Sequence, residues 1–246
     1  MEDNLNHTGA STWMGLIQKL RGLGHELPAL ILLLLVIGFV WIFIELADEV
    51  IEGETLPIDE VLILAMRNPQ DLSDPVGARW VEEIGRDFTA LGGTGVLTFI
   101  TFVVVGYLLL HRRYRIMTLV VIAVGGGMLL SFLLKGGFDR PRPELVPHGS
   151  YVYTSSFPSG HSMMSAVVYL TLGALLARIH PKRRTKAYII TIALITTLAV
   201  GVSRVYMGVH WPSDVLGGWT LGAAWALLCW LVARWLQMRG QVGAEG

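Results

Sequence analysis

Six long apolar stretches constrain the fold of this chain more than any other feature of its sequence. Each is long enough to cross a bilayer as a helix, which takes about 20 mostly apolar residues. The stretches cover residues 28–46, 89–110, 116–134, 163–179, 187–205 and 215–236. Hydrophobic residues make up 53% of the 246 residues. Charged residues make up only 15%, a smaller share than in an ordinary soluble domain. The sequence therefore predicts an all-α, polytopic membrane protein with six transmembrane helices.

We expect a single membrane-embedded domain over residues 1–246, because no linker, low-complexity tract or internal repeat divides the chain. The first stretch is longer than a signal-peptide core and lacks a small-residue cleavage site, so we expect a retained signal anchor. The largest extramembrane piece is an acidic insert over residues 47–88, on the extracytoplasmic side. Its segment "LPIDEVLILAMRN" has the apolar spacing of a short amphipathic helix at the membrane interface. We assign this helix a packing or capping role.

Basic residues gather on one side of the expected bundle. Six spans place both termini on the same side, and 12 of the 19 Lys and Arg residues fall there. They are Lys19, Arg21, Arg112, Arg113, Arg115, Arg178, Lys182, Arg183, Arg184, Lys186, Arg234 and Arg239. The positive-inside rule makes that side cytoplasmic. We therefore expect an inner-membrane protein with cytoplasmic termini, and we attribute the basic loops to topology and not to nucleic-acid binding.

Small residues inside the spans predict close helix packing. Glycines recur at Gly92, Gly93 and Gly95 in the second stretch and at residues 125–127 in the third, where they let helices approach one another. Cys229, the only cysteine, falls inside the sixth stretch. A lone cysteine there excludes a disulfide framework and a cysteine metal site.

Unusual polar residues converge on the outer face. The third span ends at Lys135, the fifth ends at Arg204, and Arg142 follows the third span on the same side. A cation at the bilayer centre costs about 2.5–3.5 kcal/mol on insertion scales, so these side chains are expected at the outer boundary or in a wet cavity. Three cations at one rim indicate an anionic ligand.

The segment "SFPSGHS" before the fourth span also suits an anion such as phosphate. Gly160 lets the backbone approach a ligand, Ser159 offers a hydroxyl, and the first N–H groups of the helix carry the positive end of its dipole. Taken alone the segment is a weak signal, because a serine before a helix is usually only an N-cap.

The start of the sixth span combines a histidine with a carboxylate. Pro212 fits the first helical position, which makes Asp214 the third residue, and its carboxylate can reach back towards His210. An aspartate that holds one imidazole nitrogen leaves the other free to attack. A lone histidine at a helix start is usually structural. His161 and the three cations on the same face favour catalysis instead.

At these residues the chain resembles the type 2 phosphatidic acid phosphatase superfamily, whose signature has three blocks. The block K-x6-R-P appears as "KGGFDRPRP", the block P-S-G-H appears unchanged, and S-R-x5-H-x3-D appears as "SRVYMGVHWPSD". All three occur in order within residues 134–218, which makes the signal strong. The resemblance implies a helical core with its site at the outer membrane boundary, a lipid phosphate as substrate, and neither metal nor organic cofactor.

The resemblance also implies a role for each matched residue. His210 would be the nucleophile that forms a phosphohistidine, Asp214 would orient it, and His161 would protonate the departing lipid oxygen. The residues that would hold the phosphoryl oxygens are Lys135, Arg142, Ser159, Gly160 and Arg204. A neutral nucleophile beside a protonated acid predicts a bell-shaped pH profile.

We therefore expect a lipid phosphatase acting on a monoester or diphosphate. It resembles the bacterial branch that acts on phosphatidylglycerophosphate and undecaprenyl diphosphate, and an outward-facing site favours the polyprenyl diphosphate. A lipid phosphotransferase of the same superfamily remains an alternative and would yield a phosphorylated acceptor in place of free phosphate. A transporter or flippase remains another, although it would normally place ionisable groups near the midplane. The vanadium haloperoxidases share the motif but are soluble.

Overall fold

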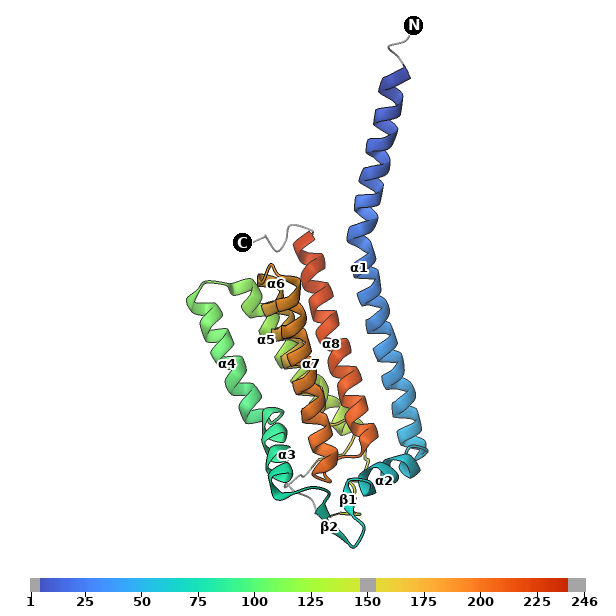
Figure 1. Ribbon diagram of the computed structural model, residues 1–246, viewed down its shortest axis with the longest axis vertical. Coiled ribbons are helices and arrows are strands. Elements are labelled where there is room, and N and C mark those ends of the chain that lie inside the picture. The colour runs from blue at the N-terminus through green and yellow to red at the C-terminus, as the bar shows by residue number, and fades with distance from the viewer. Residues whose placement is uncertain (1–4, 147–153, 239–246) are drawn as a thin grey trace.

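The computed structural model describes residues 5–146 and 154–238, and side chains within residues 27–146 and 154–237. Helices dominate this part of the chain (Figure 1), so the predicted all-α class is confirmed. The elements in chain order are α1 (Leu5–Glu52), α2 (Leu56–Leu64), β1 (Arg67–Asn68), β2 (Asp71–Pro75), α3 (Arg79–Leu91), α4 (Thr94–Leu110), α5 (Tyr114–Gly137), α6 (Gly160–Ile179), α7 (Arg183–Tyr206) and α8 (Pro212–Met238). The two short strands pair antiparallel.

Within the described residues, five helices are long and apolar enough to cross a membrane: Leu27–Glu52, Tyr114–Gly137, Gly160–Ile179, Arg183–Tyr206 and Pro212–Gln237. A sixth span exists if α3 and α4, which meet at a 50° bend, are taken together. Five of the six expected apolar stretches therefore lie within single helices, and the second, residues 89–110, crosses the break between α3 and α4. The expected start of the second span was wrong, because residue 89 belongs to α3 and the chain bends before α4 begins.

The bend falls at Gly92 and Gly93, where the chain packs closely on two neighbouring helices. A Cβ atom on Gly92 would lie 2.3 Å from Cγ1 of Val200 on α7 and 3.3 Å from Cβ of His161 on α6. Only glycine lets the backbone come this close to both helices. The break thus brings the α3–α4 junction against one of the predicted site residues.

Close packing at glycines also sets the position of α8. A Cβ atom on Gly218 would lie 2.6 Å from the carbonyl oxygen of Ser159, so α8 approaches the start of α6 backbone to backbone. The predicted packing role is confirmed at Gly126, where a Cβ atom would lie 2.4 Å from Cζ2 of Trp225. It was wrong at Gly95 and Gly125, which face open space.

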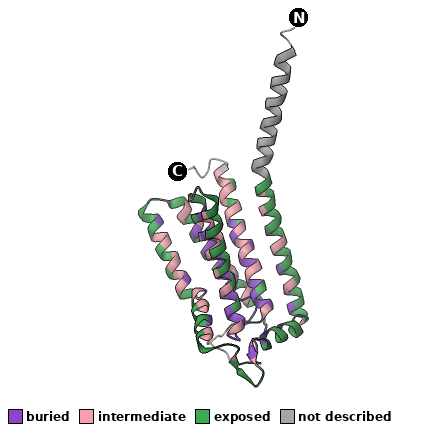
Figure 2. Ribbon diagram, in the orientation of Figure 1, coloured by how far each residue is buried: buried purple, intermediate pink, exposed green. Residues whose placement is uncertain are grey.

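Burial is concentrated on the helices around α6. Figure 2 shows buried residues along α6, the last turns of α7 and the first turns of α8, and mostly exposed residues along the described side chains of α1, residues 27–52. The exposed side chains of residues 27–52, α4 and α5 are largely apolar, as on Trp41, Phe102 and Phe132. Apolar exposure of this extent fits contact with lipid and not with water.

The two ends of the bundle differ. The α4–α5 and α6–α7 connections and the end of α8 lie at one end, and the segment from α2 to α3 lies at the other (Figure 1). The described basic residues of the expected cytoplasmic side belong to the first end; Lys19, Arg21 and Arg239 lie outside the described side chains. The expected amphipathic helix is present as α2, with Ile58 and Val61 exposed. Its predicted continuation to residue 68 was wrong, because the chain turns into β1.

Candidate active site

A cavity of about 290 Å³ lies beside the start of α6, between α4, α5, α6 and α7. Six of the eight predicted site residues line it: Lys135, Arg142, Gly160, His161, Arg204 and His210. The other two, Ser159 and Asp214, are fully buried behind its wall. Three helix ends and two connections that are far apart in sequence therefore converge on one space.

His210 lies in the short connection between α7 and α8 and is 2% exposed. Its Nδ1 is 3.1 Å from Oδ2 of Asp214, and its Nε2 is 3.1 Å from Nη1 of Arg142. Because a guanidinium can only donate, Nε2 accepts, and the proton of the neutral ring is on Nδ1. The lone pair that a nucleophile needs is therefore on Nε2, the nitrogen that faces the cation.

The sequence correctly predicted how Asp214 reaches His210. The helix α8 begins at Pro212, and the backbone N–H of Trp211 donates to Oδ2 of Asp214 at 2.9 Å. The same carboxylate thus caps the helix start and accepts from the imidazole. A single side chain fixes both the helix entry and the ring orientation.

Burial lowers the pKa of His210 to about 4, even though the hydrogen bond and charge of Asp214 act in the opposite direction. The positive charges of Arg142 and Arg204 lower it further. Above that pH the imidazole is neutral, which is the state in which a histidine can act as a nucleophile.

The cations are held at the cavity wall by neutral partners. Arg142 donates from Nε to the carbonyl of Thr154 at 3.0 Å and from Nη1 to the carbonyl of Val209 at 2.7 Å. Lys135 donates to Oγ1 of Thr154 at 3.1 Å. Arg204 is 1% exposed, and its Nε has no hydrogen-bond partner among the described residues.

The described part of the chain places no carboxylate within salt-bridge distance of Lys135, Arg142 or Arg204. Leaving a buried charge without a counter-charge is costly. The carboxylate of this site, on Asp214, contacts Arg140 and His210 instead. The cavity therefore carries a surplus of positive charge that an anion would compensate.

The start of α6 adds uncommitted donors. The hydroxyl of Ser159 accepts from the backbone N–H and the hydroxyl of Ser162, at 3.5 and 3.0 Å, so it caps the helix. Its predicted phosphate contact stays a prediction. The N–H groups of Gly160 and His161 have no partner among the residues that the structure describes. Free N–H groups at a helix N-terminus form an anion site, and both residues line the cavity.

No three His, Cys, Asp or Glu side chains in the described residues lie close enough together to hold a metal ion. The expectation that the reaction needs no metal stays a prediction.

Sequence reasoning missed the groups that surround Asp214. Arg140 donates to Oδ1 of Asp214 at 2.7 Å and to Oδ2 of Asp59 at 2.8 Å, and Oγ of Ser156 donates to Oδ2 of Asp214. Arg140 lies inside the block "KGGFDRPRP" at a position that the motif leaves open. Asp59 lies in the helix to which the sequence assigns only a packing or capping role. A carboxylate among the apolar residues of that helix was the signal that could have indicated a buried ion pair.

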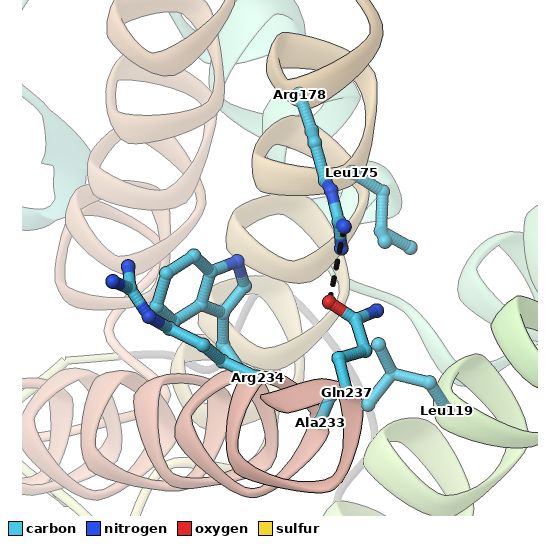
Figure 3. A pocket seen from close by; sticks show the side chains of 7 residues that line it. Leu119, Leu175, Arg178, Ala233, Arg234 and Gln237 are labelled. Carbon is cyan, nitrogen blue, oxygen red and sulfur yellow. Dashed lines mark hydrogen bonds between the residues drawn. The ribbon is translucent and has the colours of Figure 1, made fainter. Parts of the chain in front are cut away.

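Another cavity, of about 280 Å³, lies at the opposite end of the bundle between α5, α6 and α8. Figure 3 shows Arg178 pointing to Gln237, to which it donates a hydrogen bond of 3.0 Å. Neither predicted histidine lines this cavity. The candidate active site is therefore the cavity beside the start of α6.

Residues 115–238 match the model of the family described as the PAP2 superfamily. The chain belongs to the PAP2 superfamily. It is 36% identical over 148 residues to phosphatidylglycerophosphatase B of Bacillus subtilis, which covers 58% of this chain and 70% of that protein. It is 31% identical over 149 residues to an undecaprenyl-diphosphatase of Sulfolobus acidocaldarius, which covers 58% of this chain and 63% of that protein.

A solved structure agrees with these matches. The crystal structure of a transmembrane PAP2-type phosphatidylglycerolphosphate phosphatase from Bacillus subtilis superposes with a TM-score of 0.73 and 26% identity. The superposition covers 86% of this chain and 98% of that one. The resemblance predicted from three motif blocks is confirmed, and the chain is a multi-pass membrane protein of the PAP2 lipid phosphatase family.

The cavity cations, which have no carboxylate partner among the described residues, predict that the protein binds a phosphate-like anion. Orthovanadate should raise the melting temperature of the detergent-solubilised protein, since a ligand at 100 times its Kd stabilises by about 2.7 kcal/mol. Lys135→Gln should raise the vanadate concentration needed for half of the maximal shift in melting temperature by at least about tenfold. The reason is that this substitution removes one positive charge from the cavity. Lys182→Gln, at the opposite end of the bundle, is the matched control. An equal loss in both variants, or no vanadate effect in the wild type, would contradict the anion site.

Proposed function

We propose that the protein hydrolyses a phosphate monoester or diphosphate of a lipid through a phosphohistidine intermediate. One observation carries this proposal: Nε2 of a neutral, buried histidine lies at a cavity whose cations have no carboxylate partners in the described chain. A nucleophile alone would not select phosphate, and a cation cluster alone would only bind it. Together they support phosphoryl transfer.

In the first step, Nε2 of His210 attacks the terminal phosphorus while the bond from that phosphorus to its leaving oxygen breaks. The leaving group is the lipid alcohol of a monoester or the lipid phosphate of a diphosphate. His161 gives its proton to the leaving oxygen, which matters most for a monoester because an alkoxide is a poor leaving group. Asp214 keeps the Nδ1 proton in place and stabilises the positive charge that develops on the ring. Lys135, Arg142 and Arg204 stabilise the phosphoryl oxygens, which is most of what phosphoryl transfer requires of a protein.

In the second step, water releases the phosphate. His161, now neutral, takes a proton from a water molecule whose oxygen attacks phosphorus. The bond between phosphorus and Nε2 breaks, which returns His210 to its neutral form and frees inorganic phosphate. Both histidines end in their starting protonation states, so the cycle balances.

The lining of the cavity supports a lipid as the substrate. On the side towards α4 and α5 its lining includes the apolar residues Leu97, Met128 and Phe132, and the last of these is 74% exposed on the outside of the bundle. A lipid chain that lies between α4 and α5 would leave its phosphate beside Lys135, one turn from Phe132 on the same helix.

We propose phosphatidylglycerophosphate and undecaprenyl diphosphate as the two candidate substrates. The names of the similar proteins support both. We further propose that the protein resides in the inner membrane with its site facing the periplasm or exterior and its termini in the cytoplasm. The basic connections at the end of the bundle away from the cavity support this orientation.

The direct test of this function is phosphate release in detergent from undecaprenyl diphosphate, phosphatidylglycerophosphate and phosphatidic acid. His210→Ala should reduce release by at least about 10³-fold, on the scale of removing the nucleophile of a catalytic triad. His180→Ala, in the α6–α7 connection, should retain activity. EDTA should have no effect, and the preferred lipid identifies the substrate.

Loss of release with EDTA, or full activity in His210→Ala, would contradict the proposed mechanism. A phosphorylated acceptor in place of free phosphate would indicate a transferase. Lipid binding without any product would indicate a transporter.

The role of His161 predicts a dependence on the leaving group. His161→Ala should lose about 10²–10⁴-fold with an alkyl phosphate lipid, the usual range for a general acid. The loss should be much smaller with an aryl phosphate such as p-nitrophenyl phosphate, because its leaving oxygen needs no proton. Equal losses on the two substrates would show that His161 is not the acid.

A further inference from the structure

We infer that Arg140 and Asp59 are positioning residues for the His210–Asp214 pair, so that α2 at the outer end of the bundle helps to set the reactivity of the nucleophile. The inference rests on the proposed function, because it assigns to these residues a part in that reaction.

One buried guanidinium joins two segments of the chain to the start of α8. Nη1 of Arg140 donates to Oδ1 of Asp214 and to Oγ of Ser213, both at 2.7 Å. Nη2 donates to Oδ2 of Asp59 at 2.8 Å and to Oγ1 of Thr55 at 2.9 Å. All four acceptors are buried, so each bond forms away from water. Only the planar fork of an arginine can bridge two carboxylates in this way.

Asp59 completes the bridge from the opposite side. Its Oδ1 accepts the backbone N–H of Ser213 at 2.9 Å, and its Oδ2 accepts the Ser213 hydroxyl at 2.5 Å. Ser213 directly precedes Asp214 in the first turn of α8, where a negative charge is favoured by the helix dipole. Asp59 on α2 therefore holds the same turn of α8 that carries the partner of the nucleophile.

The carboxylate of Asp214 is fixed by donors on both oxygens. Oδ1 accepts from Arg140, and Oδ2 accepts from Ser156, from the N–H of Trp211 and from Nδ1 of His210. It cannot turn without breaking several of these bonds. The imidazole is thereby held in one orientation, and small errors in the placement of a nucleophile are costly in rate.

The charge count explains why a second carboxylate is present. Arg140 with Asp214 alone would be a neutral pair and would offer little to a positive imidazole. With Asp59 the group carries one net negative charge, which can stabilise the ring charge that develops as His210 attacks. A role limited to holding the fold would not require this surplus.

Among the described residues, the other charged groups at the nucleophile oppose that charge. Lys135 from α5, His161 from α6 and Arg204 from α7 line the same cavity, and Arg142 contacts Nε2 directly. Among the described residues, Asp214 is the carboxylate that contacts His210. The strength of that one partner therefore decides how readily the ring accepts a proton or a phosphoryl group.

The test is the pH dependence of kcat/KM for phosphate release. The wild type should lose activity as the pH falls through about 4, where His210 becomes protonated. Asp59→Asn leaves the Arg140 charge to act on Asp214 alone, so the imidazolium is less favoured and the acid limb moves to lower pH. Arg140→Gln removes that charge, so the acid limb moves to higher pH. Both variants should lose about 10²-fold in kcat, as misplaced catalytic groups do.

Two further variants separate charge from geometry. Arg140→Lys keeps the charge but not the fork, so the acid limb should stay near the wild-type position while kcat falls. The double variant of Asp59→Asn with Arg140→Gln removes one charge of each sign, so its acid limb should return towards the wild-type position. Arg67→Gln is the control for loss of another buried arginine at this end. It should lower the melting temperature without moving the acid limb.

Acid limbs that coincide in the wild type, Asp59→Asn and Arg140→Gln would overturn the inference and leave the proposed function intact. If either single variant fails to fold, the double variant provides the test. An acid limb of the double variant that lies away from the wild-type position would also overturn the inference. Absence of phosphate release by the wild type, or full release by His210→Ala, would overturn the proposed function itself.

Discussion

The buried hydrogen bond between Nδ1 of His210 and Asp214 holds the rest of the site in register. It fixes the tautomer, and it leaves Nε2 as the nitrogen that faces the cations of the cavity. It also connects the site to the start of α8, because the carboxylate that accepts this bond also accepts the N–H of Trp211 and so caps the helix. The close approach of α8 to α6 at Gly218 then places His161 and the free N–H groups of α6 around the same space.

Positive and negative side chains lie on different sides of His210. The cations at the cavity wall bond to neutral carbonyls and hydroxyls, which keeps them available for a phosphate. The carboxylates lie behind the histidine, where Arg140 joins them. A buried ion pair of this kind is weak support for stability as such, and its value here is the geometry that it imposes. The fold of this chain thus places positive charge on one side of the His210 imidazole and the carboxylates on the other.

Much of this arrangement could be predicted from the sequence, because bilayer thickness fixes span length and Pro212 fixes the register of Asp214. The convergence of Lys135, His161 and Arg204 followed from span direction alone. The close packing of Gly92 on α6 and α7 could not be predicted, since it depends on side chains that are distant in sequence. The bridge between Asp59 and Arg140 joins residues 81 positions apart, and only the tertiary fold brings them together. The sequence also could not separate a capping hydroxyl on Ser159 from a phosphate-binding one, because both need a serine before a helix.

A histidine nucleophile can be tested by rapid-quench trapping with a lipid that carries radiolabelled phosphate. We predict a transient label on the protein that is stable in base, labile in acid and located on the peptide containing His210. The label should decay at the rate of phosphate release and be absent from His210→Ala. Steady release without any labelled protein on that timescale, or a label stable in acid on another peptide, would contradict a histidine nucleophile.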